Sequence, residues 1–297
     1  MSKIHLMTSI VATADSKSAC IAGHGILLSG DFELAPGIII RPSPPRFDLK
    51  VVAEGCETLG DYAVTLSMME FASFYLEIQD EAGGKELAAK TWNSLRLFPL
   101  LALGCHSPCD SLYSWSGSST VHFAVATPHT AFRRATKPVQ VSVDQLNWAR
   151  TNLRRFESLQ KDTTFVTSLT SYTNSHHLFG HRSRIMQLWA GIECLFNISS
   201  EITRTLALYS ALLLEQDDAD LRYELFKKIK KDYGIRSKVV HGNSTTEDVL
   251  EDAYHRSSSL LARLLSRCVE LSRVPSIEEL DRAALAGHVT TLHVELS

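Results

Sequence analysis

The chain of 297 residues has 44% hydrophobic and 21% charged residues, the composition of a globular protein with about two domains. Its formal net charge of -3 excludes a surface coated with cations for nucleic acid, so any RNA contact has to come from a local patch. The first twenty residues lack the apolar run of a secretory signal, and residues 95–104 are too short to span a membrane. We therefore expect a cytoplasmic protein without membrane contact.

Short strand-like runs dominate the first 140 residues, which we expect to form a mixed α/β domain with a sensor or regulatory role. Glycine, proline and serine separate these runs, which cover residues 3–12, 23–34, 37–42, 74–79 and 120–128. A helix is predicted over residues 83–98, with its apolar stripe formed by Ala88, Trp92, Leu95 and Phe98. Residues 63–71 fit a helix or a strand.

The strand pattern ends near residue 142, and residues 143–297 are predicted to form a second, helical domain. Two segments carry clear apolar stripes at helical spacing. The stripe of the first is Ile185, Leu188, Trp189, Ile192, Leu195 and Phe196, and that of the second is Ile202, Leu206, Tyr209 and Leu213. A third helix follows with Leu221, Leu225, Ile229 and Tyr233, and a last long helix is predicted over residues 246–273. The fold class is therefore an α+β domain followed by an all-α bundle.

Six cysteines show no disulfide-framework spacing, and we expect them to be reduced. Cys105 and Cys109 could ligate zinc together with Cys56 or His106, which would suit a metal-dependent hydrolase. No second cysteine pair matches their spacing, so a plain loop is the favoured interpretation. We expect neither a metal nor another cofactor.

The third helix carries the positive charge that the whole chain lacks. Residues 222–238 hold seven basic and two acidic residues, a net charge of +5 that would attract phosphate. An ordinary solvated helix face is the alternative. The candidate RNA-binding residues are Arg222, Lys227, Lys228, Lys230, Lys231 and Lys238.

Arg236 and His241 stand at the end of this helix, five positions apart. On a straight helix that offset corresponds to a turn of about 140° and a rise of about 7.5 Å, so the two side chains would diverge. Gly234 and Gly242 offer a way to bring them together, through a loosened turn at the first and a left-handed cap at the second. A second copy of the chain is the other way to complete the pair.

The segments IMQLWAGIECLF, EITRTLALYSALLLE and ELFKKIKKDYGIRSKVVHGN together resemble the Apea-like branch of the HEPN superfamily. The motif of that branch is a tyrosine, then Arg-Ser, two apolar residues and His-Gly. The resemblance covers roughly residues 143 to 290. It implies a helical bundle, usually dimeric, whose catalytic members cut RNA without a metal.

By position, the resemblance implies that Arg236 and His241 are the catalytic pair and that Tyr233, Ser237 and Gly242 support the motif. The residue types fit this chemistry independently, since a histidine exchanges protons near neutral pH and an arginine offers a planar fork of donors to phosphoryl oxygens. Glu193 could orient Arg236, or it could be an ordinary carboxylate at the edge of the core. Ser237 could donate to phosphate or be a polar helix residue.

The function expected from the sequence is thus a metal-independent endoribonuclease of HEPN type, a stress or anti-phage toxin. Its partners would be single-stranded RNA and a second copy of the chain, with an activating ligand or protein at the N-terminal domain. The superfamily also contains members that bind RNA or proteins without cutting. A non-catalytic scaffold is therefore the alternative.

Overall fold

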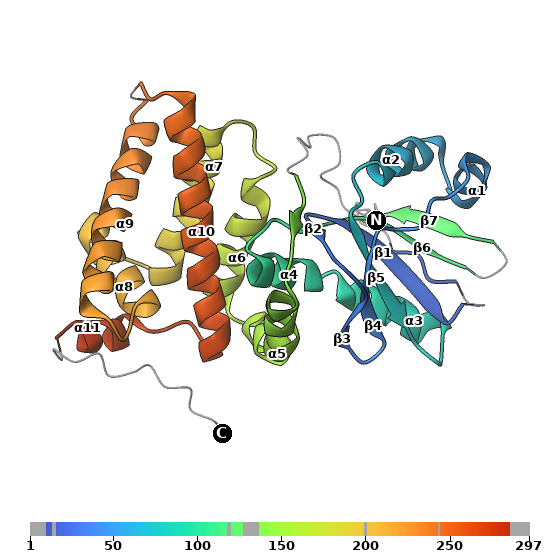
Figure 1. The fold of residues 1–297 in the computed structure, drawn as a ribbon, viewed down its shortest axis with the longest axis horizontal. Coiled ribbons are helices and arrows are strands. Elements are labelled where there is room, and N and C mark those ends of the chain that lie inside the picture. The colour runs from blue at the N-terminus through green and yellow to red at the C-terminus, as the bar shows by residue number, and fades with distance from the viewer. Residues whose placement is uncertain are drawn as a thin grey trace, which may run out of the picture. The chain divides into compact units, whose positions relative to one another are not determined.

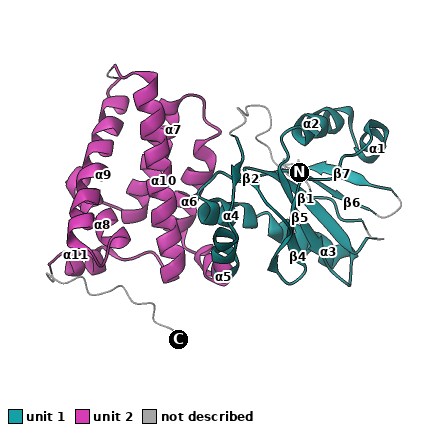
Figure 2. Cartoon of the chain, viewed as in Figure 1, with its two compact units in different colours: residues 1–151 teal, residues 152–297 magenta. Residues whose placement is uncertain are grey.

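The computed structural model describes residues 10–13, 16–117, 120–126, 137–198, 201–242 and 244–285. The chain forms two compact units, residues 1–151 and 152–297 (Figure 2). The boundary between them falls inside one helix, α5 (Val143–Leu159). A sheet-containing region followed by a region of helices is the order that the sequence predicts.

Unit 1 is built on a six-stranded antiparallel sheet with the strand order β3-β4-β5-β1-β6-β7 (Figure 1). The strands are β1 (Ser18–His24), β3 (Phe32–Ala35), β4 (Ile38–Pro42), β5 (Phe74–Gln79), β6 (Asp110–Ser116) and β7 (His122–Val125). A short parallel pair, β2 (Ile26–Leu27) with β8 (Val139–Gln140), lies outside this sheet. Most of the strand predicted over residues 3–12 lies outside the described residues.

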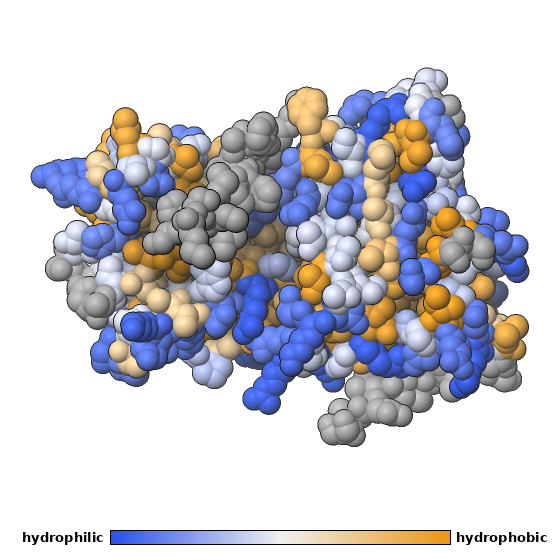
Figure 3. Space-filling view, turned by 180° about the vertical axis from the view of Figure 1, so that it is seen from behind, coloured by the Kyte–Doolittle hydropathy of each residue, from blue (hydrophilic) through white to orange (hydrophobic). Residues whose placement is uncertain are grey.

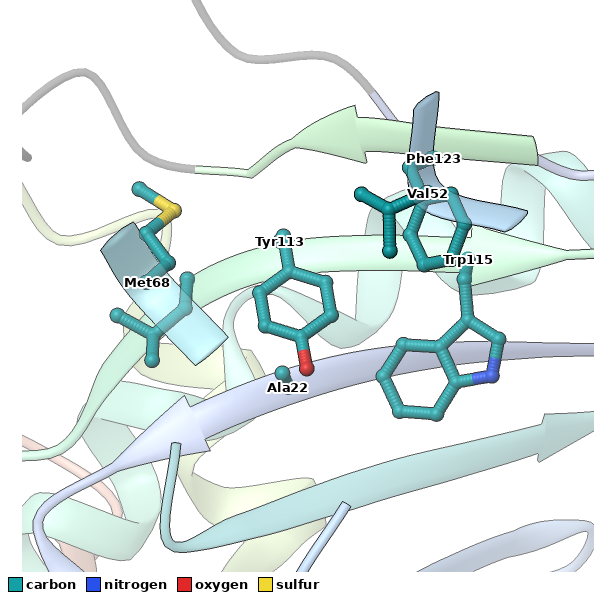
Figure 4. Packing of buried hydrophobic residues seen from close by; sticks show 7 residues of the cluster. Ala22, Val52, Met68, Tyr113, Trp115 and Phe123 are labelled. Atoms are coloured by element: carbon teal, nitrogen blue, oxygen red, sulfur yellow. The ribbon is translucent and has the colours of Figure 1, made fainter. Parts of the chain in front are cut away.

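Helices cover both faces of the sheet. They are α1 (Leu49–Gly55), α2 (Leu59–Met69), α3 (Gly84–Ser94) and α4 (Leu97–Cys105). Successive strand residues point to opposite faces. On one face, a side chain added at Gly23 would collide with Phe74 and with Phe98 of α4. On the other, Ala22 belongs to a core with Val52 of α1 and Met68 of α2 (Figure 4).

The buried stripe of α3 differs from the predicted one. Leu87, Thr91 and Ser94 are buried, whereas the side chain of Trp92 is 46% exposed. The helix also ends at Ser94, and Phe98 belongs to α4. The prediction of one continuous helix over residues 83–98 was therefore wrong. The buried hydroxyls of Thr91 and Ser94 donate to the backbone carbonyls of Leu87 and Lys90 one turn back, so two polar residues occupy the face where an apolar stripe was expected. Residues 63–71, left open between helix and strand, lie mostly in α2.

Unit 2 is a helical bundle with α7 (His181–Phe196) packed against several neighbours. The other helices are α6 (Thr163–Ser175), α8 (Ile202–Leu214), α9 (Ala219–Val240), α10 (Glu247–Leu271) and α11 (Ile277–Leu285). All six predicted stripe residues of α7 are buried. A Cβ added at Gly191 would lie 2.7 Å from the Ser171 side chain on α6 and 3.0 Å from Leu261 on α10. Gly191 thus allows three helices to approach closely.

Polar and apolar side chains are interspersed on the face of the protein that Figure 3 displays. Most soluble-protein surfaces are mixed in this way, so scattered apolar residues mark no site by themselves. The apolar run at residues 95–104 lies mainly in the buried helix α4. Within the described ranges, we find no helix with the length and hydropathy that a membrane crossing requires.

Candidate functional site

Helix α9 carries the predicted motif. It begins after Asp218, whose side chain accepts hydrogen bonds from the backbone N–H groups of Asp220 and Leu221, each at 2.9 Å. Capping of this kind satisfies donors that the first turn leaves free. The helix then continues without a break through Gly234. The loosened turn expected at Gly234 is absent, because helical hydrogen bonding continues across it.

The predicted cap at the end of α9 is present. His241 is the C-terminal cap residue, and its backbone N–H donates to the carbonyl of Ser237 at 3.1 Å. Gly242 then adopts a φ of 71°, in the left-handed region that glycine enters without steric cost. The chain therefore turns away from the helix axis directly after the histidine.

Arg236 forms an ion pair with Glu193 on the neighbouring helix α7. Its Nη2 lies 2.9 Å from Oε1 and 3.3 Å from Oε2 of that carboxylate. The two side chains are 26% and 27% exposed, so the pair lies at the edge of the bundle rather than in water. This is the contact expected if Glu193 orients Arg236. The buried Nε of Arg236 has no hydrogen-bond partner within the described part of the chain.

Tyr233 forms the other support of Arg236. The guanidinium carbon lies 5.3 Å from the centre of the Tyr233 ring, within cation–π range. The ring in turn meets Trp189 edge to face, with 5.2 Å between the ring centres. Burial, together with the charge of Glu193, raises the pKa of Tyr233, so the phenol stays neutral at physiological pH. Arg236 is thus held between a carboxylate and an aromatic ring.

His241 lies apart from this cluster. It is exposed at the end of α9, and no hydrogen bond of its side chain is recorded within the described residues. Because α9 is continuous, the offset of about 140° and about 7.5 Å between Arg236 and His241 applies. One copy of the chain therefore brings together Arg236, Glu193 and Tyr233, and leaves His241 on another side of the helix. Ser237 is partly buried, and Lys238 is exposed.

The predicted RNA-binding residues do not form one surface. Arg222 donates to the backbone carbonyls of Glu215 and Gln216, beyond the end of α8, which is a structural contact. Lys227 pairs with Glu224 and lies 4.9 Å from the centre of the Tyr223 ring. Lys228, Lys230 and Lys231 divide between two faces of α9.

On one face of α9 a lysine lies beside aromatic side chains, and on the other face two lysines border a groove. Lys230 lies 5.3 Å from the centre of the Phe226 ring, next to the stacked pair Tyr223 and Phe226. Lys228 and Lys231 instead line a groove against α10. The charge run is therefore not a single patch.

Sequence reasoning missed two arginines that join this groove from α10. Arg256 pairs with Asp232 at 2.9 Å, and Arg263 pairs with Glu215 at 2.8 Å. Both are far from α9 in sequence and become its neighbours only when α9 and α10 pack as an antiparallel pair. The available signal was that these arginines lie seven residues apart, and so on one line, along the polar side of an amphipathic helix.

Cys105 and Cys109, the pair considered as zinc ligands, are buried, whereas Cys56 is partly exposed. Burial raises the pKa of the Cys105 thiol to about 12, and burial together with Cys105 and Asp110 raises the pKa of Cys109 well above its usual value. Metal ligation requires thiolates, which these surroundings disfavour. All six cysteines lie in described residues, and none is in a disulfide.

Comparison with known proteins gives no relative. No family profile, no curated protein and no solved structure matches the chain.

Proposed function

We propose that the chain is a metal-independent endoribonuclease of the HEPN type that acts on single-stranded RNA. The proposal rests on the position of Arg236. Its guanidinium forms an ion pair with Glu193 and lies against the Tyr233 ring. A positioned arginine stabilises charge that builds on phosphoryl oxygens, without reorganising during the reaction. The motif position of the exposed His241 supplies the proton-transfer group.

In the proposed step, the ribose 2'-hydroxyl attacks the adjacent phosphorus while His241 accepts its proton. A bond forms between the 2'-oxygen and phosphorus, the bond to the 5'-oxygen breaks, and the 5'-oxygen takes a proton from water and leaves as a 5'-hydroxyl. Arg236 stabilises the charge on the phosphoryl oxygens. Because Arg236 and His241 diverge within one chain, the complete site consists of Arg236 from one copy and His241 from another. The biological role would be that of a stress or anti-phage toxin, with the sheet-containing unit as its sensor.

The experiment is incubation of the purified protein with labelled RNA, with and without EDTA. Cleavage should survive EDTA, should yield 2',3'-cyclic phosphate ends and should stop when the scissile nucleotide is 2'-deoxy. A His241→Ala variant should lose on the order of 10² or more in rate, as loss of acid–base catalysis usually does. The matched control is His122→Ala, which removes an exposed histidine from β7. Full activity in a folded His241→Ala protein, or equal cleavage of DNA, would refute the proposal.

A second candidate function is RNA or protein binding without cleavage. One argument for it is that the Glu193 carboxylate neutralises the charge of Arg236. The other is that, within the described residues of one chain, no contact joins Arg236 to His241. This candidate predicts a wild-type protein that binds RNA and stays inert under every activating condition. Replacement of His241 would then leave RNA affinity unchanged.

A further inference from the structure

Unit 1 contains a pocket of about 550 Å³ that is lined by the loop after β4, by the end of α2 and by Tyr113 of β6. That size lies within the range of about 300 to 1,000 Å³ that is usual for small-molecule sites. The lining residues fall within 43–49 and 66–72, apart from Tyr113. None of the motif residues lines the pocket, so it is separate from the proposed cleavage site.

The apolar lining of the pocket is accessible. Its partly buried apolar residues are Phe47, Leu66, Met69 and Ala72. Each of them leaves apolar surface open, against which a ligand with an apolar body would be buried. Phe47 is also fixed in place, because its ring meets those of Trp115 and Phe123 edge to face.

The loop that forms one wall of the pocket is held in one shape. Pro44 and Pro45 each fix their own φ angle, and the backbone N–H of Ser43 donates to the carbonyl of Ser73 at 3.3 Å. Ser43 itself has a φ of 48°, in the left-handed region that is costly for a residue other than glycine. Strain of this kind persists at sites where a ligand is held. A wall that is already ordered loses little entropy on binding.

Two charged side chains of opposite sign line the pocket, Arg46 and Glu70. Both are exposed, and neither forms an ion pair within the described ranges. Glu70 caps the C-terminal end of α2, whose last turn holds no basic residue. The carboxylate and the negative end of the helix dipole therefore both favour a ligand ammonium group. The guanidinium of Arg46 favours a ligand carboxylate.

Tyr113 adds a hydrogen-bond donor to the pocket. Its side chain is 1% exposed, and its ring extends from β6 towards Ala22 of β1 (Figure 4). In the part of the chain that the structure describes, no hydrogen bond of its hydroxyl is recorded. Burial, together with Cys20, raises the pKa of Tyr113, so the hydroxyl keeps its proton. A buried donor without a partner costs free energy, which an acceptor on a ligand would recover.

We propose that this pocket binds a small zwitterion with an apolar body, either a free apolar amino acid or a dipeptide of such residues. The ligand carboxylate pairs with Arg46, its ammonium group pairs with Glu70, and its apolar side chain lies against Phe47 and Met69. The Tyr113 hydroxyl donates to a ligand oxygen. The charges of Arg46 and Glu70 cancel, so a polyanion such as a nucleotide does not suit the pocket.

The test measures binding of L-phenylalanine and of phenylalanyl-leucine to the full chain by calorimetry. Arg46→Met should weaken binding of both zwitterions at least about tenfold, because a charge-assisted contact is lost. It should leave binding of phenethylamine, which has no carboxylate, unchanged. Glu70→Gln should likewise weaken both zwitterions and leave 3-phenylpropionate, which has no ammonium group, unchanged. The matched controls are Lys85→Met and Glu86→Gln, which remove the same charges from exposed positions on α3.

Tyr113→Phe separates a binding role of the hydroxyl from a structural one. It should weaken zwitterion binding without lowering the free energy of unfolding of the unbound protein, because the hydroxyl loses no partner within the chain. Lower stability with unchanged affinity would contradict its role in binding.

Tighter binding of L-phenylalanine would assign the pocket to free amino acids, and tighter binding of phenylalanyl-leucine would assign it to dipeptides. Wild type that binds neither probe would overturn the proposal. Equal losses in the pocket and control variants, or equal losses for ligands that lack the charge in question, would overturn it as well. Binding is measured without RNA, so its failure is distinguished from failure of the nuclease.

Discussion

Arg236 shows how a single ion pair can serve either stability or catalysis. Its partner Glu193 lies one residue past a buried position of α7, and the pair is about one-quarter exposed. Such a pair is screened less than a surface pair and desolvated less than a core pair. Its contribution to stability should therefore fall between those limits.

Replacing Glu193 with Gln should lower the free energy of unfolding by about 1–2 kcal/mol, because the half-buried Arg236 charge loses its counter-charge. Urea unfolding monitored by circular dichroism measures the effect. The control is Glu224→Gln, which breaks the exposed pair with Lys227 and should change stability far less, because water screens that pair. Equal costs for both variants would show that Arg236 is not held by charge.

The tyrosine Tyr209 links two helices and gives a pH-dependent signal. Its hydroxyl donates to Asp281 of α11 at 2.5 Å. Burial, together with that carboxylate, raises the pKa of Tyr209 to about 12. A pKa raised in the folded state means that folding retains the proton. The stabilisation is complete below pH 10 and is lost as the pH rises towards 12.

Accordingly, the stability difference between wild type and Tyr209→Phe should be largest near pH 8 and should shrink near pH 11. Urea unfolding of both proteins at the two pH values measures it. The comparison isolates Tyr209, since the other buried tyrosines titrate in both proteins. A difference that stays constant with pH would contradict the shifted pKa.

At the scale of the helices, Gly191 and Gly234 differ in the space that a side chain would find. A side chain at Gly191 would contact α6 and α10 at 2.7 and 3.0 Å, whereas one at Gly234 would meet no atom within 4 Å. Both glycines lie inside helices. Alanine should therefore overpack the first position and merely improve helix propensity at the second.

Gly191→Ala should destabilise the protein by about 1–3 kcal/mol, as overpacking usually does. Gly234→Ala should stabilise it by up to about 1 kcal/mol through helix propensity. Thermal unfolding of both variants checks the signs. Unchanged stability of the Gly191→Ala variant would mean that α6 and α10 can move away from α7 at little cost.

The sequence predicts some elements well and misses others for physical reasons. β4 and β5 are rich in isoleucine, leucine and aromatic residues, and both were predicted. Strands β1 (SACIAGH) and β6 (DSLYSWS) were not, although they pair at the centre of the sheet. Their alanine, glycine and serine residues have little strand preference of their own. Burial between neighbouring strands, which a single sequence does not reveal, makes them strands.

In the candidate site, too, some features could be predicted from the sequence and others could not. The sequence correctly predicted the buried stripe of α7 and the left-handed cap at Gly242, because both are local properties. The divergence of Arg236 and His241 is an inference from the continuity of α9. The groove could not be predicted, since Arg256 and Arg263 approach Lys228 only through packing between helices. Catalysis by the motif stays a prediction.

For the whole molecule, the divergence of Arg236 and His241 predicts a dimer with shared sites. Light scattering should show a dimer at micromolar concentration, and monomer alone would count heavily against it. A sharper test mixes Arg236→Ala with His241→Ala protein. Mixed dimers regain one site with both residues, so cleavage should rise well above that of either variant alone. No recovery after subunit exchange would place both residues of each site in one chain.

RNA binding should also depend strongly on salt, because the lysines of α9 act mainly through phosphate charge. Raising salt from about 50 to about 200 mM should weaken binding many-fold, because each counterion that RNA releases gains less entropy in the more concentrated solution. Reversing Lys227, Lys228 and Lys231 to Glu should weaken binding and flatten this dependence, without altering sequence preference. Fluorescence anisotropy with labelled RNA measures both. Unchanged affinity would return the charge run to a solvated helix face.

The burial of the cysteines has a practical consequence for following the protein's internal motions. Thiolate is the form that alkylating reagents attack, and burial raises the thiol pKa of Cys105 and Cys268 to about 12. Both side chains are buried, so each thiol reacts appreciably only when its surroundings open. Cys105 lies in unit 1 and Cys268 in unit 2. The alkylation rate of each cysteine, measured by peptide mass spectrometry, would therefore report how often its own unit opens.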